Sequence, residues 1–336
     1  MDVVDDIASF GRLTVVEIKL EKQSNLSGDA ELASQGFGRL SDEEARVFDP
    51  GSQLEKACGF FREFGYVVLT DGLSEPELAH LNEFFQRTQT AFPDKWGLGE
   101  GRKPHHRDQG LIFSQPLLDH PELDQYTQHP RSFPVVSELM GGGECVRFSE
   151  FNFRETPENA GIGAMNFHHD AVREDRFIRE PYNPCDWLCA IHYLTDTFPG
   201  TPAFCVVPGS NGFKTLAEAY QSLADKYVEV PIYGKAGTCI LYDTATYHTR
   251  IDGDGVRGRR TWHQYYARGG WLKTETKYVR PPTPVLTDWN LFPERLAMHA
   301  DPAKRRFFSH WNTAQCEWVA SGFDQEVRES MPRGLQ

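Results

Sequence analysis

Three His-x-Asp pairs occur in the sequence, and each could supply two ligands to one metal ion. The pairs are His106/Asp108, His168/Asp170 and His299/Asp301. On a β-strand, side chains two residues apart point to the same side, so the imidazole and the carboxylate of such a pair can reach one ion. Two imidazoles and one carboxylate form the facial triad of mononuclear non-haem iron(II) sites, which keeps the other coordination positions open. Each pair therefore needs a second, distant histidine.

The surrounding sequence favours the pair formed by His168 and Asp170. This pair lies in a strand-rich region, and His248 follows eighty residues later as the second imidazole. Arg259 stands eleven residues beyond His248, on the next strand-like run. We therefore predict that His168, Asp170 and His248 bind the metal, and that His169 faces away from it because neighbouring strand residues alternate.

The other two pairs are weaker candidates. The pair at positions 299 and 301 is followed only by His310, which is too close in the sequence to reach the opposite side of a barrel. The pair at positions 106 and 108 could combine with His168, and Arg179 then lies eleven residues further on. It is the serious rival, although it lies in a charged, turn-rich stretch.

Short runs of β-branched and aromatic residues, separated by Gly, Pro, Asn and Asp, begin after residue 145 and would position these ligands. Many short strands with turn residues between them are typical of a sandwich or jelly roll. The predicted fold class is therefore mainly β with flanking helices. We expect strands over 146–154, 188–194, 203–207, 239–242 and 261–267. His192 and His263 lie in two of these strands and could line the cavity.

Two amphipathic helices are predicted before the strands. Apolar residues recur with helical spacing from Leu54 to Gly65, and a strand-like run follows. Ser74 and Glu77 have the spacing of a capping box, which predicts the start of the second helix. We further expect loops with one short helix over 94–132 and a helical insertion over 216–227.

The bulk composition indicates a globular protein with an acidic surface. The formal net charge of -13 disfavours nucleic acid and anionic membranes as partners. No apolar run approaches the roughly 20 residues that span a bilayer, and the first residues are acidic where a secretory signal is basic. Seven cysteines, an odd number without a CxxC pair, are typical of reduced thiols. We expect a cytoplasmic protein that acts on a small molecule; the sequence does not define its oligomeric state.

Five segments of the chain resemble, in the same order, the phytanoyl-CoA dioxygenase family of iron(II) and 2-oxoglutarate oxygenases. Singly they are unspecific, but together they cover about residues 50–270. They are 64–69 with Leu73 and Ser74, 167–170, 190–196, 207–211, and 236–238 running to His248. The resemblance implies a double-stranded β-helix, a cupin-like jelly roll, over 51–275. Residues 1–50 would then be an N-terminal extension, and residues 276–336 a C-terminal segment that packs on the barrel.

The resemblance also implies the chemistry of the site. His168, Asp170 and His248 would bind iron(II), and Arg259 would bind the distal carboxylate of 2-oxoglutarate, because a guanidinium matches a carboxylate in two hydrogen bonds. Arg260 is the alternative, since only one of two adjacent strand residues points inward. The enzyme would consume O2 and 2-oxoglutarate and oxidise a substrate, most simply by hydroxylation. Related halogenases have a small residue in place of the aspartate, so the carboxylate favours oxygenation.

Two asparagines are further candidates for the cofactor pocket. Asn166 shares the predicted strand face of the ligands and could donate a hydrogen bond to the oxoacid, and Asn152 on the preceding strand is a candidate of the same kind. The sequence departs from the family over 249–254, where Asn and Ser are frequent, and at Asn211, where His is frequent. These departures leave the three metal ligands unchanged.

Two other classes of function stay open on the sequence. One is a redox-silent metal cupin, an isomerase or hydrolase with zinc or manganese, which would have no need of Arg259. The other is an inactive barrel that serves as a binding protein and consumes no 2-oxoglutarate. The substrate is not readable, because specificity in this architecture comes from irregular segments such as 94–132 and 171–186.

Overall fold

The computed structural model describes residues 47–96, 111–158, 166–170, 185–268, 277–279 and 291–308. Most of the predicted N-terminal extension lies outside these residues. The rival His-x-Asp pair at positions 106 and 108 lies outside them as well, as do Arg179, His310 and most of the expected specificity segment 171–186.

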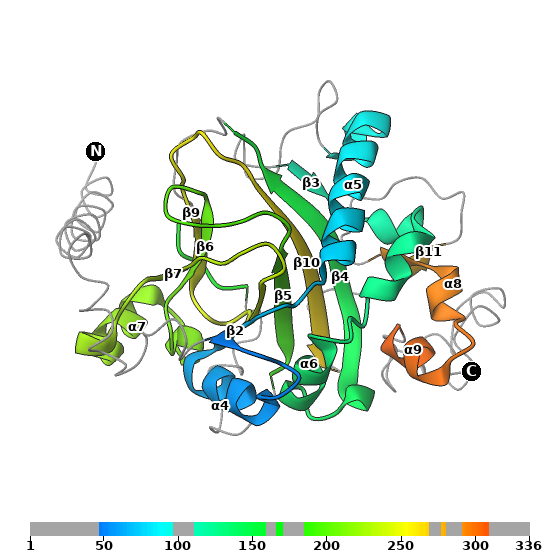
Figure 1. Cartoon of the computed structure of the whole chain (residues 1–336). Helices are drawn as coiled ribbons and strands as arrows, with labels where there is room; N and C mark the ends of the chain where they lie inside the picture. The colour runs from blue at the N-terminus through cyan, green and yellow to red at the C-terminus, as the bar shows by residue number, and fades with distance from the viewer. Residues whose placement is uncertain are drawn as a thin grey trace, which may run out of the picture.

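A seven-stranded sheet forms the centre of the molecule (Figure 1). Its strands are β1 (Val47–Phe48), β2 (Tyr66–Leu69), β3 (Leu111–Phe113), β4 (Val146–Thr156), β5 (Trp187–Tyr193), β8 (Cys239–Asp243) and β10 (Arg259–Arg268). They are ordered β1-β2-β8-β5-β10-β4-β3. All neighbours pair antiparallel except β1 and β2. This order joins distant parts of the chain, because β5 lies between β8 and β10.

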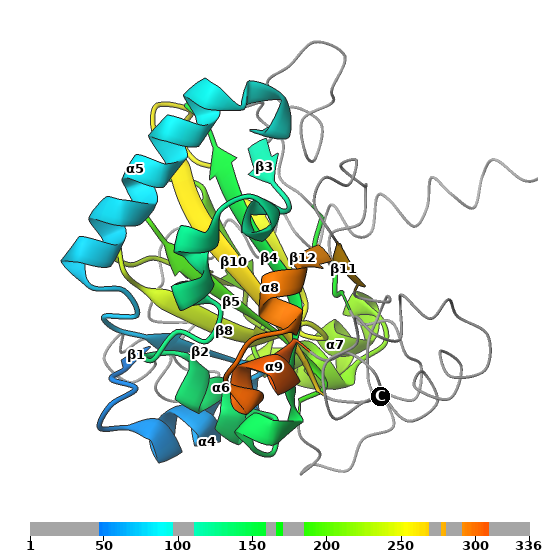
Figure 2. The same cartoon turned by 90° about the vertical axis from the view of Figure 1, so that its right-hand side faces the viewer.

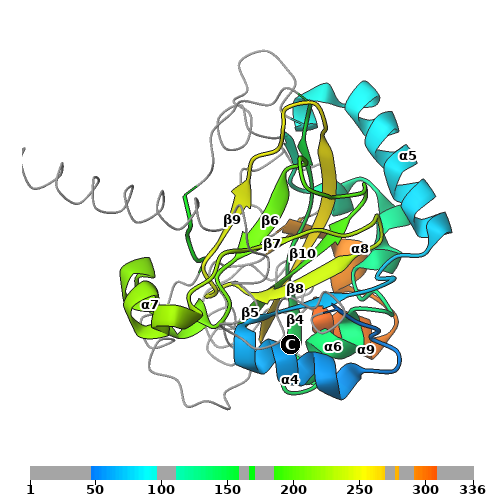
Figure 3. The same ribbon diagram turned by 60° about the vertical axis from the view of Figure 1, so that its left-hand side comes forward.

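A smaller antiparallel sheet faces one side of the large sheet (Figure 3). It consists of β6 (Ala203–Val206), β7 (Val230–Ile232) and β9 (His248–Ile251), in the order β7-β6-β9. The inner faces of the two sheets share one apolar core, in which Phe204 and Ile232 of the small sheet pack with Tyr66, Ile191 and Tyr242 of the large one. Two facing sheets, antiparallel except for the β1–β2 pair, form the jelly roll that the sequence predicts. We refer to the space between them as the barrel interior.

Helices cover the other face of the large sheet (Figure 2). They are α5 (Glu75–Ala91), α6 (Phe133–Leu139), α8 (Glu294–Ala297) and α9 (Pro302–Phe307). Helix α4 (Leu54–Phe64) packs against β2 and α6. Helix α7 (Leu216–Leu223) lies beyond the small sheet. A second apolar core fills this layer. Every residue of β5 is consequently buried, because one of its faces meets helices and the other meets the small sheet.

The two N-terminal helices end and begin where the sequence predicts. Helix α4 ends at Gly65, which has a φ of 76° and donates its N–H to the carbonyl of Phe61. Such a left-handed residue favours glycine. Helix α5 begins with a capping box, in which the backbone N–H of Ser74 donates to the Glu77 carboxylate at 2.8 Å.

The predicted strands are confirmed, and the short elements differ in detail. Within 94–132 the structure has the strand β3 and the 3-10 helices η1 (Pro93–Trp96), η2 (Pro116–Leu118) and η3 (Pro121–Tyr126) in place of one short helix. Proline at their first positions favours helix starts but the segments are too short to propagate. The helical insertion is confirmed as α7 followed by η7 (Ala224–Lys226). The remaining strands β11 (Lys277–Val279) and β12 (Leu291–Pro293) form a separate parallel pair.

Helix α9 packs on the helix-covered face of the large sheet. The ring of Phe307 contacts Phe133 of α6 at 5.7 Å and Tyr266 of β10 at 6.1 Å between centroids. In the described part of the chain, no helix combines the length and the apolar character needed to cross a bilayer.

Candidate metal centre

The side chains of His168, Asp170 and His248 converge in the barrel. One ligand atom of each lies within 4.8 Å of the other two, and no other cluster of potential metal ligands occurs among the described residues. Nε2 of His248 lies 3.8 Å from a carboxylate oxygen of Asp170, and the two imidazole centroids are 4.5 Å apart. Two imidazoles and one carboxylate at these separations fit one mononuclear iron(II) ion.

Backbone pairing holds this arrangement. His168 and His248 form an isolated antiparallel bridge, with N–H donors 3.0 and 2.8 Å from the partner carbonyls. The N–H of Asp170 then donates to the carbonyl of Thr244 at 2.7 Å. The prediction that the pair lies on a strand is thus wrong in extent, because the described segment 166–170 forms a single bridge to the start of β9. One bridge suffices to bring both ligands to the distal histidine.

Hydrogen bonds to backbone carbonyls fix the tautomer of both imidazoles. Nδ1 of His168 donates to the carbonyl of Asn166 at 3.0 Å, and Nδ1 of His248 donates to the carbonyl of Thr246 at 2.8 Å. A carbonyl can only accept, so each Nδ1 carries a hydrogen, and in the neutral ring Nε2 is then the nitrogen with the lone pair. Such outer contacts orient metal-binding histidines. Both rings are therefore prepared to coordinate through Nε2.

The environment of His248 keeps its ring neutral. It packs between Tyr242 and Phe204, at 4.7 and 5.4 Å between centroids. Burial lowers the pKa of His248 to about 4, and the charge of Asp170 offsets only part of this effect. Metal binding requires a deprotonated imidazole, so this histidine is in its ligand form at neutral pH.

The intervening histidine faces away from the centre, as predicted. The ring of His169 meets the ring of Tyr247 edge-on at 4.9 Å, and its Nε2 lies 3.3 Å from the carbonyl of Lys214. The competing pair at positions 299 and 301 serves another purpose: the Asp301 carboxylate caps α9 by accepting from the N–H of Ala303.

Arg259, at the start of β10, points into the barrel interior. Its residue is 8% exposed, and its guanidinium lies over the ring of Tyr193 at 5.9 Å. Nε and Nη1 have no hydrogen-bond partner among the described residues. A buried donor without an acceptor is costly, and a charged one more so. Among the described residues, the site therefore presents buried guanidinium donors that an anionic ligand could satisfy.

Arg260, the alternative for this role, points to the helix-covered face. Its Nε donates to Glu155 at 2.8 Å, and its guanidinium lies over the ring of Phe85 of α5. The two arginines thus occupy opposite faces of β10, and only Arg259 faces the metal ligands' side of the sheet.

The two predicted asparagines differ in their position. Asn166 is exposed, and its contact to the centre is the backbone carbonyl that holds His168. Asn152 is fully buried; its side-chain oxygen accepts from Nε of Arg154 at 2.9 Å, and its Nδ2 has no partner in the described part of the chain. Arg154 was missed in the sequence analysis. Its signal was the two-residue spacing that places it on the same strand face as Asn152.

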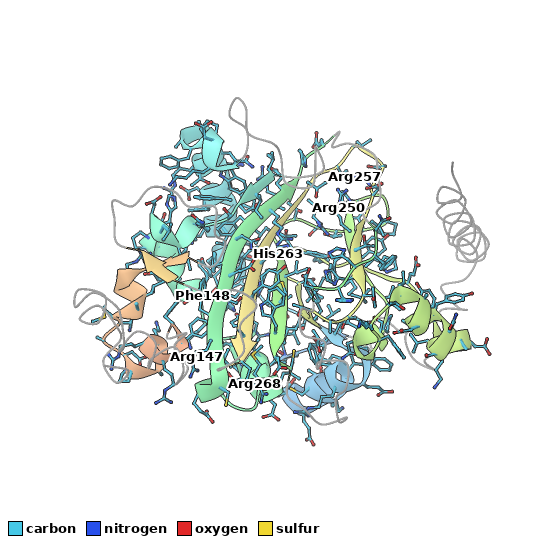
Figure 4. All side chains as sticks on the ribbon, turned by 180° about the vertical axis from the view of Figure 1, so that it is seen from behind. Arg147, Phe148, Arg250, Arg257, His263 and Arg268 are labelled. Carbon is cyan, nitrogen blue, oxygen red and sulfur yellow. The ribbon has the colours of Figure 1, made fainter. Side chains whose placement is uncertain are left out.

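The two strand histidines also lie on opposite faces. His263, labelled at the middle of β10 in Figure 4, faces the barrel interior, with its Nε2 3.0 Å from the Thr261 hydroxyl. His192 instead stacks on Trp262 at 4.0 Å on the helix-covered face. Only His263 is placed to line the cavity.

The comparison with known proteins identifies one family whose model matches the chain and several solved structures with a similar fold. The family described as phytanoyl-CoA dioxygenase matches residues 61–249. No match was found among curated protein sequences.

Three solved structures illustrate the shared fold. One is the non-haem alpha-ketoglutarate-dependent carbocyclase SnoK from nogalamycin biosynthesis, which has a TM-score of 0.52 at 20% sequence identity. The match covers 66% of this chain and 87% of SnoK. The epimerase SnoN from the same biosynthesis has a TM-score of 0.51 at 18% sequence identity. The match covers 72% of this chain and 98% of SnoN. HygX from Streptomyces hygroscopicus, solved with nickel and 2-oxoglutarate, has a TM-score of 0.51 at 17% sequence identity. The match covers 67% of this chain and 90% of HygX. At such identities the likeness concerns the fold, and function must be argued from the site.

Proposed function

The chain belongs to the phytanoyl-CoA dioxygenase family, and we propose that it is an iron(II)- and 2-oxoglutarate-dependent dioxygenase that hydroxylates a small organic molecule. The observation that carries this proposal is the convergence of His168, Asp170 and His248, whose ligand atoms lie within 4.8 Å of one another. The metal and 2-oxoglutarate bound in the structure of HygX support the choice of cofactors.

Arg259 supports the assignment of 2-oxoglutarate as the co-substrate. Its guanidinium is buried, faces the same interior as the metal ligands and has unsatisfied donors. The distal carboxylate of 2-oxoglutarate offers the two acceptors that such a fork binds. A redox-silent metal cupin would gain nothing from this buried charge.

Each of the other residues has a separable role. Backbone carbonyls orient the rings of His168 and His248 through Nδ1, which leaves Nε2 of each ring for coordination, and Asp170 contributes the negative charge of the ligand set. When bound, iron(II) and 2-oxoglutarate supply the activation of O2, with decarboxylation to succinate and CO2. Asn166 would support this set through its carbonyl, and the free Nδ2 of Asn152 is directed to the same interior.

The outcome at the substrate depends on how the chain positions it. Proximity and orientation select among competing reactions of a reactive site. SnoK and SnoN are described as a carbocyclase and an epimerase, so the same fold supports outcomes other than hydroxylation. Hydroxylation is the simplest of these.

The proposal is tested by adding Fe(II) and then 2-oxoglutarate to the protein without oxygen. We expect the weak visible charge-transfer band of an iron–oxoacid chelate in the wild type and no band in His168→Ala. His169→Ala is the matched control, because its ring lies against Tyr247 outside the centre; this variant should keep the band. A wild-type protein that binds iron but gives no band with 2-oxoglutarate would refute the proposal.

A second experiment separates oxygenase from redox-silent chemistry. In air, and with ascorbate supplied as the two-electron reductant, the loaded wild type should convert 2-oxoglutarate to succinate slowly even without a substrate, and Arg259→Ala should not. An unchanged rate in Arg259→Ala would contradict the assignment of this residue.

A further inference from the structure

A second guanidinium lies in the barrel interior, beside the one assigned to 2-oxoglutarate. Arg154 of β4 pairs in register with Thr261 of β10, two residues from Arg259. Its Nε donates to the Asn152 side-chain oxygen at 2.9 Å, and its Nη2 to the Tyr265 hydroxyl at 3.3 Å. The residue is half-buried. Its position is thus fixed by neutral groups on two strands, while part of its surface stays accessible.

The hydrogen bonds of Arg154 within the described part of the chain go to neutral groups. Its partners are the Asn152 amide and the Tyr265 phenol, and the charge of Glu150 acts on the guanidinium electrostatically. The neighbouring cation Arg250 differs in this respect, since it is paired with Asp252 at 3.2 Å. A half-buried charge without a counter-ion is expensive to maintain.

By formal charge, the loaded metal centre does not need this cation. Iron(II) and Arg259 together carry three positive charges, and Asp170 with doubly charged 2-oxoglutarate carries three negative charges, so the loaded centre is formally neutral. Arg154 therefore adds one positive charge to a site that is already balanced. A singly charged anion would restore the balance, whereas a phosphate monoester would exceed it.

Asn152 adds a second donor at the same place. Its side-chain oxygen is occupied by Arg154, so its Nδ2 is turned away from the guanidinium. This Nδ2 belongs to a fully buried residue and has no partner among the described residues. A guanidinium and a neighbouring amide N–H can each donate to one oxygen of a carboxylate. The pairing also explains why a buried amide is left unsatisfied.

We propose that Arg154 and Asn152 bind a carboxylate of the primary substrate, so that this enzyme oxidises an organic acid. The proposal rests on the proposed function for the identity of the reaction site and names the substrate class of that site. The site lies toward the start of β10, at the end of the strand where Figure 4 shows Arg250 and Arg257, and opposite the end with Arg147 and Arg268.

The test uses benzoate as the carboxylate probe, benzamide as its neutral counterpart and phenyl phosphate as the dianion. Each is titrated calorimetrically into the full chain loaded with Ni(II) and 2-oxoglutarate. Because hydrogen bonds to charged groups are stronger than neutral ones, we expect benzoate to bind about 10- to 100-fold tighter than benzamide, and tighter than phenyl phosphate. Equal binding of benzoate and benzamide by the wild type would overturn the proposal without any variant.

The variants locate the effect. Arg154→Gln should abolish the preference for benzoate, and Arg154→Lys, which keeps the charge, should retain part of it. Arg257→Gln is the control: it removes the same charge from the same end of the barrel, but its exposed guanidinium pairs with Asp254, and the preference should persist. If Arg154→Gln fails to fold, Asn152→Leu should reduce the preference through loss of the second donor, and an unchanged preference there would count against the site.

A parallel measurement separates this proposal from the proposed function. Affinity for 2-oxoglutarate, followed without oxygen by the Fe(II) charge-transfer band, should be unchanged in Arg154→Gln. Loss of that affinity would show that Arg154 belongs to the co-substrate site and overturn the proposal. If the wild type gives no band but still prefers benzoate through Arg154, the proposed function fails and the carboxylate site stands.

Discussion

Replacing Arg259 by methionine should affect stability and co-substrate binding in opposite directions. The residue is 8% exposed, and two of its guanidinium nitrogens have no partner among the described residues. Burial lowers the pKa of Arg259, although Tyr193 acts against this. The charge therefore destabilises the unliganded fold, and methionine preserves much of the side-chain volume without it.

The magnitudes follow from the two environments. Removing an unsatisfied buried donor should raise the free energy of unfolding by about 1–3 kcal/mol. Losing the contact with the Tyr193 ring should lower it by about 1 kcal/mol. The net gain of up to about 2 kcal/mol should raise the melting temperature of the metal-free Arg259→Met protein by up to about 4 °C. Loss of two charge-assisted hydrogen bonds should weaken 2-oxoglutarate binding by about 3–5 kcal/mol, which is a factor of roughly 100 to 5,000.

Thermal unfolding with and without ligands measures both effects in one assay. With Ni(II) and 2-oxoglutarate at about 100 times its dissociation constant, the wild type should gain about 2.7 kcal/mol, and the variant should gain only what Ni(II) provides. The order of the two melting temperatures should therefore reverse on loading.

The adjacent arginine is the matched control. Arg260→Met removes the charged partner of Glu155 and leaves only the Gln89 amide on that carboxylate, so the metal-free protein should lose about 1–3 kcal/mol while 2-oxoglutarate still stabilises it. The reasoning is refuted if Arg259→Met is destabilised without ligands and keeps its response to 2-oxoglutarate.

Three further perturbations test other parts of the structure. In Asp170→Ala, excess Ni(II) should no longer raise the melting temperature, whereas in the wild type it should add about 2.7 kcal/mol at 100 times the dissociation constant; an equal rise in both would exclude Asp170 as a ligand. Burial holds the pKa of His192 well below its ordinary value of 6.5, so the stability associated with its neutral form is complete above pH 6.5 and is lost at lower pH. His192→Phe, which keeps a ring on Trp262, should reduce the acid-induced loss by up to about 1.4 kcal/mol per pH unit in metal-free denaturant titrations; parallel curves would argue against this role. Gly65→Ala should cost about 2–4 kcal/mol in the same titrations, because its φ of 76° disfavours a side chain and the new methyl would overlap the Thr246 hydroxyl; a loss below 1 kcal/mol would show that the turn adapts.

Local signals predicted the elements that position the site. The end of α4 at Gly65 and the start of α5 at Ser74 depend on residues within one turn of the chain, so both could be read directly. The candidate metal ligands could be recognised because His168, Asp170 and His248 combine a fixed local spacing with a distant third member. Such a combination constrains the fold as well as the chemistry.

The remaining site residues were harder to predict, because the sequence does not show which face of a strand points into the barrel interior. Alternation shows that Arg259 and Arg260 face opposite ways, but not which of them faces inward, because that depends on the helices that cover the other side. In β5 both faces are buried, so the sequence pattern could not assign His192 to either face. The side chain of Asn166 is exposed because its segment forms one bridge rather than a strand.

Spacing alone places Arg154 on the strand face of Asn152 but does not show which groups Arg154 contacts. Its orientation depends on the pairing of β4 with β10, which contains an irregularity between Tyr265 and Tyr266. A register shift of this kind changes which residues of β4 oppose the inward residues of β10. Only the three-dimensional pairing shows that Arg154, Asn152 and Tyr265 meet.

The most direct test of the metal centre is anomalous diffraction at the iron absorption edge, from crystals grown without oxygen in the presence of Fe(II). The account predicts one strong anomalous peak per chain, within bonding distance of Nε2 of His168, a carboxylate oxygen of Asp170 and Nε2 of His248. A chain whose single iron peak lies elsewhere, or whose three side chains remain without metal at saturating Fe(II), would contradict it.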